Sequence, residues 1–365
     1  MQIDKNKATP IYSQIYEHLR EEIVSGRMAN GALVPSIRQI QKETGVARES
    51  VKRALNQLAT DGYVRKVQGK GTFVSRRRPG ERFWGLVVPF YTDFYNEMIV
   101  EMSLAAEERD ISIEHACDYD DWERQIEIVQ DFAWRQAEGI VIVPTRDEKK
   151  TLETYQKLSR HHALVLFDHS SIASQLPYVI QDYVLGVSIA MNEMILGGAR
   201  RIAYVRDPLW PGGNPIYRTM EEAYAEKASD LDRPYVRFCD SPHSLSREEL
   251  ADPQFDALMC VNDRVACMLA GMLREQGVAV PDRVQIAGYH DSEVARFFTP
   301  QITTVSPDLP RMCRLIRDII HRYHESEAVE MLQHVVIPHL ENRGTTRRKQ
   351  LSDRRKMEIQ MGGTA

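Results

Sequence analysis

Apolar residues recur at helical spacing three times in the first 62 residues, and two β-rich runs follow. The helical stripes predict amphipathic helices, and the third places apolar residues at i, i+3, i+4 and i+7 from Val51, on one buried face. Thr9 before Pro10 predicts a hydroxyl N-cap for the first helix. The expected helices cover about 10–26, 36–45 and 47–62, and the expected strands cover 63–67 and 72–74.

Farther along the chain, short apolar runs alternate with amphipathic helical stretches. Such alternation indicates parallel sheets whose two faces are covered by helices. In these sheets ligands bind beyond the carboxyl ends of the strands. The expected strands are 84–89, 111–113, 139–144, 163–167, 201–205, 257–261 and 284–288.

Two segments show no apolar period. Residues 76–82 are charged and contain Pro-Gly, so we expect a linker between a domain at 1–75 and a second domain at 83–346. The polar end of the chain, 347–365, is expected to be a disordered tail. The predicted fold class is therefore α/β with a small N-terminal α+β domain.

Charge is divided unevenly along the chain, which has 365 residues and a net charge of −5. Residues 1–80 hold 15 Lys and Arg against 7 Asp and Glu, a net charge of +8, whereas the remaining residues carry −13. A basic segment on an acidic body indicates that the first part binds a polyanion. A basic face that is only solvated is the alternative.

The composition disfavours several classes of protein. No apolar run approaches the roughly 18 residues of a membrane span, and no early apolar region marks a signal peptide. We therefore expect a cytoplasmic protein without a membrane partner. Its five cysteines form no CxxC pair, so neither a disulfide framework nor a structural metal site is expected. These cysteines are Cys117, Cys239, Cys260, Cys267 and Cys313.

The second and third predicted helices form a helix-turn-helix, because a tight turn joins them and the third is polar on its outer face. The N-terminal residues of such a helix reach base edges in the major groove. Arg48 stands there, and an arginine can donate two parallel hydrogen bonds to guanine. The glycine-rich hairpin tip allows close approach of the backbone, and Lys70 can meet phosphate or the minor groove.

The stretch from Val34 to Val74 closely resembles the winged helix of GntR-type transcription regulators. The shared features are Pro-Ser-x-Arg, Gly-Val-x-Arg, Ala-Leu-x-x-Leu, Asp-Gly-Tyr and Gly-x-Gly-Thr-Phe-Val. Glu49 stands where the family often has Ser or Thr; it either accepts from a cytosine or supports the helix N-terminus. The resemblance implies that Arg38, Arg48 and Lys52 contact DNA and that Gln68, Gly69 and Lys70 form the wing tip. Ser50, on the polar face of the third helix, is a further candidate for contact with DNA.

Aromatic and polar residues follow the strands of the second domain at their carboxyl ends. Aromatic faces combined with carboxylates and amides suit a polyhydroxylated ligand, although each aromatic residue could equally pack in the core. These candidates are Phe90, Tyr91, Phe94 and Tyr95 after the first strand, Asp168, Asn262, and His290.

Residues 83–346 resemble the sugar-binding domain of LacI-type repressors, which is similar to periplasmic binding proteins. The resemblance rests on the Asn-Asp, Gly-x-x-x-Pro, Gly-Tyr-His-Asp and Pro-x-Ile-Thr-Thr-Val succession and on the closing Ile-Pro-His-Leu-Glu-Asn-Arg-Gly-Thr-Thr. It implies ligand contacts from Asp168, Arg218 and Asn262. His290 replaces the usual acidic residue, so it either contacts ligand, with an affinity that varies between about pH 5.5 and 7.5, or packs against the hinge.

Together the two parts resemble chimeric bacterial regulators such as arabinose-responsive repressors. We expect a homodimeric repressor that binds double-stranded DNA at a pseudo-palindromic operator and is released by a sugar. An activator, or a corepressor-dependent regulator that senses a non-sugar molecule, is the alternative. An enzyme is not expected, because no paired nucleophile and base, metal-ligand cluster or phosphate-binding glycine loop occurs, and no cofactor is implied.

Overall fold

The computed structural model describes residues 3, 9–25, 27–29, 31–74, 82–107, 110–169, 175–209, 215–231, 234–325 and 332–347. It separates a smaller compact unit, which holds residues up to Phe83 together with 131–137, from a larger unit with the rest of the described chain. The expected linker, apart from Arg82, and the expected tail after Arg347 lie outside the described residues.

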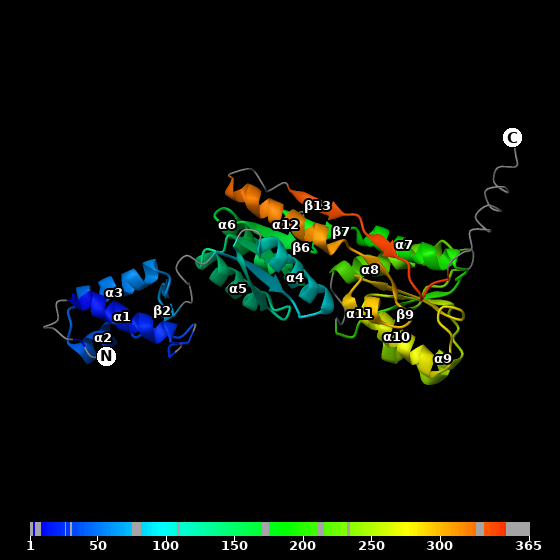
Figure 1. Cartoon of the computed structure of the whole chain (residues 1–365), viewed down its shortest axis with the longest axis horizontal. Helices are drawn as coiled ribbons and strands as arrows, with labels where there is room; N and C mark the ends of the chain where they lie inside the picture. Colours follow the sequence, from blue (N-terminus) through cyan, green and yellow to red (C-terminus); the bar gives the residue numbers. More distant parts are fainter. Residues whose placement is uncertain are drawn as a thin grey trace. The chain divides into compact units, whose positions relative to one another are not determined.

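The smaller unit has the expected winged-helix architecture (Figure 1). A two-stranded antiparallel hairpin follows three helices, and Leu33 forms an additional antiparallel bridge to Phe73. The elements are α1 (Ile11–Val24), α2 (Ile37–Thr44), α3 (Arg48–Thr60), β1 (Val64–Val67) and β2 (Gly71–Val74).

Local chemistry explains where these helices begin and end. Ser36 and Gln39 form a capping box at the start of α2, and Gly45 adopts the left-handed conformation that ends it. The prediction that Thr9 caps α1 is wrong. Pro10 itself occupies the N-cap position, and no side chain caps the helix there.

Each helix of the smaller unit contributes to one core. Ile15, Ile40, Val51 and Leu58 are completely buried, and Leu19 is nearly so. The i, i+3, i+4, i+7 spacing in α3 therefore packs its apolar face inward, which leaves its polar face for other contacts.

Two six-stranded sheets form the larger unit, in the orders β13-β7-β6-β5-β3-β4 and β14-β12-β11-β10-β8-β9. We call the parts built on them lobe 1 and lobe 2. Parallel pairing dominates, but the edge strand β14 runs antiparallel to β12. The strands are β3 (Phe83–Val88), β4 (Ser112–Cys117), β5 (Gly139–Ile142), β6 (Leu164–Phe167), β7 (Tyr178–Gln181), β8 (Ile202–Val205), β9 (Phe238–Cys239), β10 (Ala257–Cys260), β11 (Gln285–Tyr289), β12 (Thr303–Ser306), β13 (Gln333–Val336) and β14 (His339–Glu341).

The helices cover these sheets, and each lobe has its own apolar core. The chain passes between the lobes after β7, after β12 and after β13, so the lobes are joined by three neighbouring connections. The helices are α4 (Asp93–Glu107), α5 (Trp122–Trp134), α6 (Glu148–Ser159), α7 (Tyr183–Leu196), α8 (Pro215–Ser229), α9 (Arg247–Ala251), α10 (Asp263–Glu275), α11 (Glu293–Phe297) and α12 (Leu309–His324), with a short 3-10 helix at Pro242–Ser244.

Candidate functional site

The polar face of α3 presents basic side chains to solvent. Arg48 and Lys52 are exposed on this helix, Arg38 is exposed on α2, and Ser50 is half-buried. Arg53, on the same helix, lies 3.8 Å from the centre of the Tyr12 ring, so it also packs against α1. The helix-turn-helix thus carries three of the predicted DNA contacts as accessible cations.

The hairpin tip is equally accessible. Gln68, Gly69 and Lys70 are all exposed, and the Lys70 amide donates to the Val67 carbonyl at 3.0 Å. Gly69 has a φ of +75°, which a residue with a side chain rarely adopts. This turn leaves the backbone free to come close to a nucleic-acid strand.

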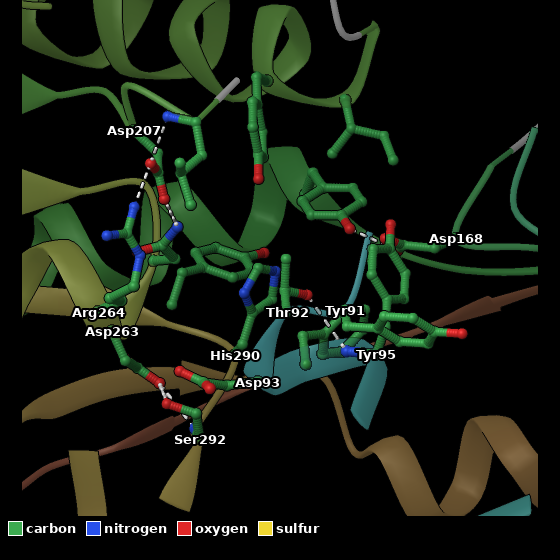
Figure 2. A pocket seen from close by; sticks show the side chains of 17 residues that line it. Tyr91, Thr92, Asp93, Tyr95, Asp168, Asp207, Asp263, Arg264, His290 and Ser292 are labelled. Carbon is green, nitrogen blue, oxygen red and sulfur yellow. Dashed lines mark hydrogen bonds and ion pairs between the residues drawn. The ribbon is translucent and has the colours of Figure 1, made fainter. Parts of the chain in front are cut away.

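The larger unit contains a cleft between its lobes, with a cavity of about 150 Å³ (Figure 2). It lies where the carboxyl ends of strands from both sheets meet, as expected for this architecture. The lining residues are Tyr91, Thr92, Asp93, Phe94, Tyr95 and Asp168 from lobe 1, Tyr183 at a connection, and Asp207, Leu209, Ile216, Tyr217, Asn262, Asp263, Arg264, Tyr289, His290 and Ser292 from lobe 2.

Aromatic rings form much of the wall. Phe94 stacks on His290 with ring centres 4.4 Å apart and planes inclined by 20°, and it also stacks on Phe167 at 6.0 Å. Tyr183 stacks on Tyr289 at 5.7 Å. The rings of both lobes therefore meet across the cleft, where apolar faces can cover the C–H surface of a small ligand.

Asp168 lies at the end of β6, with a φ of +54°. Its carboxylate accepts a hydrogen bond from the Tyr183 hydroxyl (Figure 2). Burial raises the pKa of Asp168 to about 7, and the bond from Tyr183 opposes this rise. The group can therefore either accept or donate a hydrogen bond near neutral pH.

In lobe 2, Asp207, Asn262 and Arg264 form a polar cluster. The Asn262 side-chain amide donates to one Asp207 oxygen at 2.7 Å, and the Arg264 guanidinium pairs with the other oxygen. The Asn262 side-chain carbonyl also accepts from the Val265 amide at 2.9 Å, which caps α10. Asn262 thus joins the start of a helix to the floor of the cleft.

Asp263 is held by neighbouring elements. It accepts from the amide and hydroxyl of Ser292, at 2.7 and 2.9 Å, and from the Thr304 hydroxyl at 2.5 Å. Burial raises the pKa of this carboxyl to about 7. Its bonds link the start of α10 to α11 and β12.

His290 faces the cleft but does not titrate in the expected range. Burial lowers the pKa of its imidazole to about 4, because a charged ring would lose its hydration there. The expected change of affinity between pH 5.5 and 7.5 through His290 is therefore wrong, since the ring is neutral throughout that range.

The structure brings together six of the predicted ligand residues: Tyr91, Phe94, Tyr95, Asp168, Asn262 and His290. Phe90 is half-buried and Arg218 is exposed on α8, and neither belongs to the lining. Their contact with ligand stays a prediction. Sequence reasoning missed Tyr183, Asp207, Tyr217 and Arg264. Two of them carried a signal in the sequence. Asp207 lies two positions after β8, and Arg264 directly follows Asn262-Asp263.

One polar contact bridges the lobes outside the cavity. The Glu97 carboxylate of α4 accepts from the Glu293 amide at 2.7 Å and from the Arg296 guanidinium at 3.0 Å, both in lobe 2. Within the described chain, no group of three His, Cys, Asp or Glu side chains could hold a metal ion. None of the described helices is long and apolar enough to cross a membrane.

Comparison with known proteins accounts for both units. Residues 11–74 match the bacterial regulatory proteins of the gntR family, and residues 192–346 match the periplasmic binding protein-like domain. The arabinose metabolism transcriptional repressor of Geobacillus stearothermophilus is 25% identical over 363 residues, 94% of this chain and 99% of that repressor. The repressor NagR of Bacillus subtilis is 35% identical over 86 residues, 24% of this chain and 35% of NagR.

Solved structures match the larger unit. A periplasmic binding protein/LacI transcriptional regulator from Alkaliphilus metalliredigens, complexed with D-xylulofuranose, has a TM-score of 0.60 at 20% identity and covers 73% of this chain and 99% of its own. A dimeric Lac repressor has a TM-score of 0.62 at 16% identity, over 73% of this chain and all of its own. The predicted fold class, a winged helix followed by a two-lobed periplasmic-binding-protein-like domain, is thereby confirmed.

Proposed function

We propose that the chain, which matches the gntR family in its N-terminal part and the periplasmic binding protein-like domain in its C-terminal part, is a transcription repressor whose operator affinity a sugar lowers. The observation that carries this proposal is the cleft, in which aromatic walls and hydrogen-bonding groups from both lobes converge, on a chain that also holds a gntR-type module.

On the DNA side, we propose that α3 enters the major groove with Arg48 at a base edge, and that Lys52 and Arg38 meet phosphates. Exposed cations on a helix whose other face is buried support this placement. Ser50 and the hairpin tip at 68–70 complete the proposed contact surface.

A sugar would be held by both lobes at once. Asp168 and Asn262 offer hydrogen bonds from opposite sides, and Tyr91, Tyr95 and Phe94 offer ring faces. His290, neutral and stacked on Phe94, offers one further hydrogen bond. Closure around the ligand would change the conformation of the larger unit, and the coupling to DNA must be reciprocal.

We propose that the larger unit dimerises through an apolar patch formed by Val100 and Leu104 of α4 with Val294 and Phe297 of α11. These side chains are exposed, Phe297 by 77%. The bonds from Glu97 to Glu293 and Arg296 place the two helices next to each other. An exposed patch of this kind marks an interface, and a two-fold dimer would suit a pseudo-palindromic operator in the cytoplasm.

Selection from a random DNA pool with the full chain, followed by titration with L-arabinose and D-xylulose, tests the proposal. We expect enrichment of a two-half-site sequence and at least a tenfold weaker affinity for it when a bound sugar is present. A sugar that tightens operator binding would favour a corepressor-dependent regulator instead. Failure to enrich any sequence would overturn the DNA-binding role.

A further inference from the structure

The ionisable side chains that line the cleft are mostly acidic. Among the described lining residues, four are carboxylates (Asp93, Asp168, Asp207 and Asp263) and Arg264 is the single guanidinium or ammonium group. Proteins bind phosphate and carboxylate groups with arginine, lysine or unoccupied helix N-termini. The cleft would have to supply one of these to hold an anionic ligand.

Arg264 is not available for that purpose, because it already pairs with Asp207 (Figure 2). The Asp207 side chain is 2% exposed, so its carboxylate depends on Arg264 and on the 2.7 Å bond from Asn262. Transfer of Arg264 to a ligand anion would leave a buried carboxylate without its counter-charge, which is strongly unfavourable.

The N-termini of α10 and α4, two of the helices that begin at the cleft, are also occupied. Asn262 accepts from the Val265 amide at the start of α10, and the Thr92 hydroxyl accepts from the Tyr95 amide at the start of α4, at 3.4 Å. The first turns of these helices carry Asp263 and Asp93, which would repel an anion.

The neighbouring stretches of sequence add no positive charge. Residues 170–174, Ser-Ser-Ile-Ala-Ser, and residues 210–214, Trp-Pro-Gly-Gly-Asn, contain neither lysine nor arginine. Arg218 lies on the exposed side of α8, and even as a ligand contact it would be one cation beside Asp93 and Asp168.

We propose that the cleft selects an uncharged polyol and rejects phosphorylated or acidic sugars, with the Asp207–Arg264 pair as the determinant of this selectivity. The inference rests on the proposed function, in which a sugar is the effector. Neutral hydroxyls can exchange hydrogen bonds with Asp168, Asn262 and the outer edge of Arg264 while the ion pair stays intact, whereas a phosphate competes directly with Asp207 for Arg264.

Calorimetry on the full chain with matched pairs of probes tests this inference without any variant. L-Arabinose, D-xylulose and D-ribose are each compared with their 5-phosphate esters, and L-arabinose also with L-arabinonate and D-glucosamine. We expect a neutral sugar to bind and its phosphate ester to bind at least 100-fold more weakly. An ester that binds as tightly as its sugar, or binding of D-glucosamine alone, would overturn the inference and leave the sugar-responsive regulator standing. No binding by any probe would instead overturn the sugar effector itself.

Asp207→Asn tests the role of the ion pair. The substitution keeps the shape of the side chain but releases Arg264 from a charged partner, so we expect the phosphate ester to bind at least tenfold more tightly than it binds the unaltered chain. Asp240→Asn is the matched control, because Asp240 is 86% exposed and pairs with Arg206 at 2.7 Å away from the cleft lining. Equal ester affinities in the two variants would show that the Asp207–Arg264 pair does not exclude anions.

Discussion

Arg48 is the residue on which the proposed reading of DNA sequence depends. It is exposed at the first position of α3, where a guanidinium can reach two acceptors of a guanine. We expect Arg48→Ala to cost about 1–3 kcal/mol of binding free energy for the selected operator and to relax the preference at one base pair. Fluorescence anisotropy with single-base operator variants measures both effects.

Arg27→Ala is the control for that experiment, because it removes the same charge from a residue that pairs with Glu22 at 2.8 Å, outside the proposed contact surface. We expect it to weaken binding to all sequences slightly and equally. The same loss for both variants, without a change in base preference, would contradict the placement of Arg48 at a base edge.

Asp168 supplies a prediction about pH. Burial raises its pKa from the ordinary 3.8 to about 7, so the folded chain binds a proton more tightly than the unfolded chain does. Its contribution to stability is present below about pH 4 and is lost as the pH rises through 7. Asp168→Asn removes this titration, because an amide side chain does not ionise. The amide oxygen can still accept a hydrogen bond from the Tyr183 hydroxyl.

We therefore expect the free energy of unfolding of Asp168→Asn, relative to that of the unaltered chain, to be larger at pH 8 than at pH 5, which means that the variant is relatively more stable at pH 8. Urea unfolding followed by tryptophan fluorescence measures this difference. Asp93→Asn is the control, since Asp93 is an exposed carboxylate that lines the same cleft. A relative stability of Asp168→Asn that is the same at both pH values would show that Asp168 stays ionised when buried.

At the scale of elements, α7 and β11 meet closely at Gly186. A Cβ atom at this position would lie 2.0 Å from the Tyr289 hydroxyl oxygen, and Tyr289 is completely buried. We expect Gly186→Ala to cost about 1–3 kcal/mol of stability through overpacking and to weaken sugar binding, because Tyr289 lines the cleft. Thermal unfolding and calorimetry report the two effects.

Gly271 in α10 provides the contrasting substitution. Nothing lies within 4 Å of a Cβ placed there, so Gly271→Ala should gain up to about 1 kcal/mol from helix propensity alone. If both substitutions changed stability in the same direction and by the same amount, close packing of α7 against Tyr289 would not be the cause.

The hydrophobic pattern of the sequence predicts some strands of the larger unit and not others. Buried strands such as β5 and β10 were predictable, because each is a continuous apolar run. The strand β12, Thr303–Ser306, and the short edge strand β14 were not, because Val305 is the one apolar residue of β12 and its threonines are buried through hydrogen bonds to Asp263 and Thr345.

Only some of the residues that line the cleft could be predicted from the sequence. Aromatic and polar residues after predicted strands were identified, but Tyr183 follows β7, a strand that was not predicted. Asp207 and Arg264 are 57 positions apart along the chain, and only the parallel pairing of β8 with β10 brings them together. Likewise, only the burial of His290 shows that its ring is neutral near pH 7.

At the scale of the whole molecule, dimerisation is the condition for reading a two-half-site operator. A single winged helix of 1–75 should bind DNA weakly, because linking two modules turns the second contact into an intramolecular one. The apolar patch of Val100, Leu104, Val294 and Phe297 is the proposed link. A charged group at its most exposed member would have to be buried without a partner in the dimer.

We expect Phe297→Asp to convert the dimer into a monomer in sedimentation equilibrium, to weaken operator binding at least tenfold, and to leave sugar binding to the larger unit intact. Ile337→Asp is the control, because Ile337 follows β13 and is 68% exposed, outside the patch. It makes the same chemical change and should leave both the dimer and operator affinity as they are. A Phe297→Asp protein that stays dimeric would place the interface on another surface. A monomer with undiminished operator affinity would show that one winged helix is enough for recognition, and that the larger unit contributes ligand sensing alone.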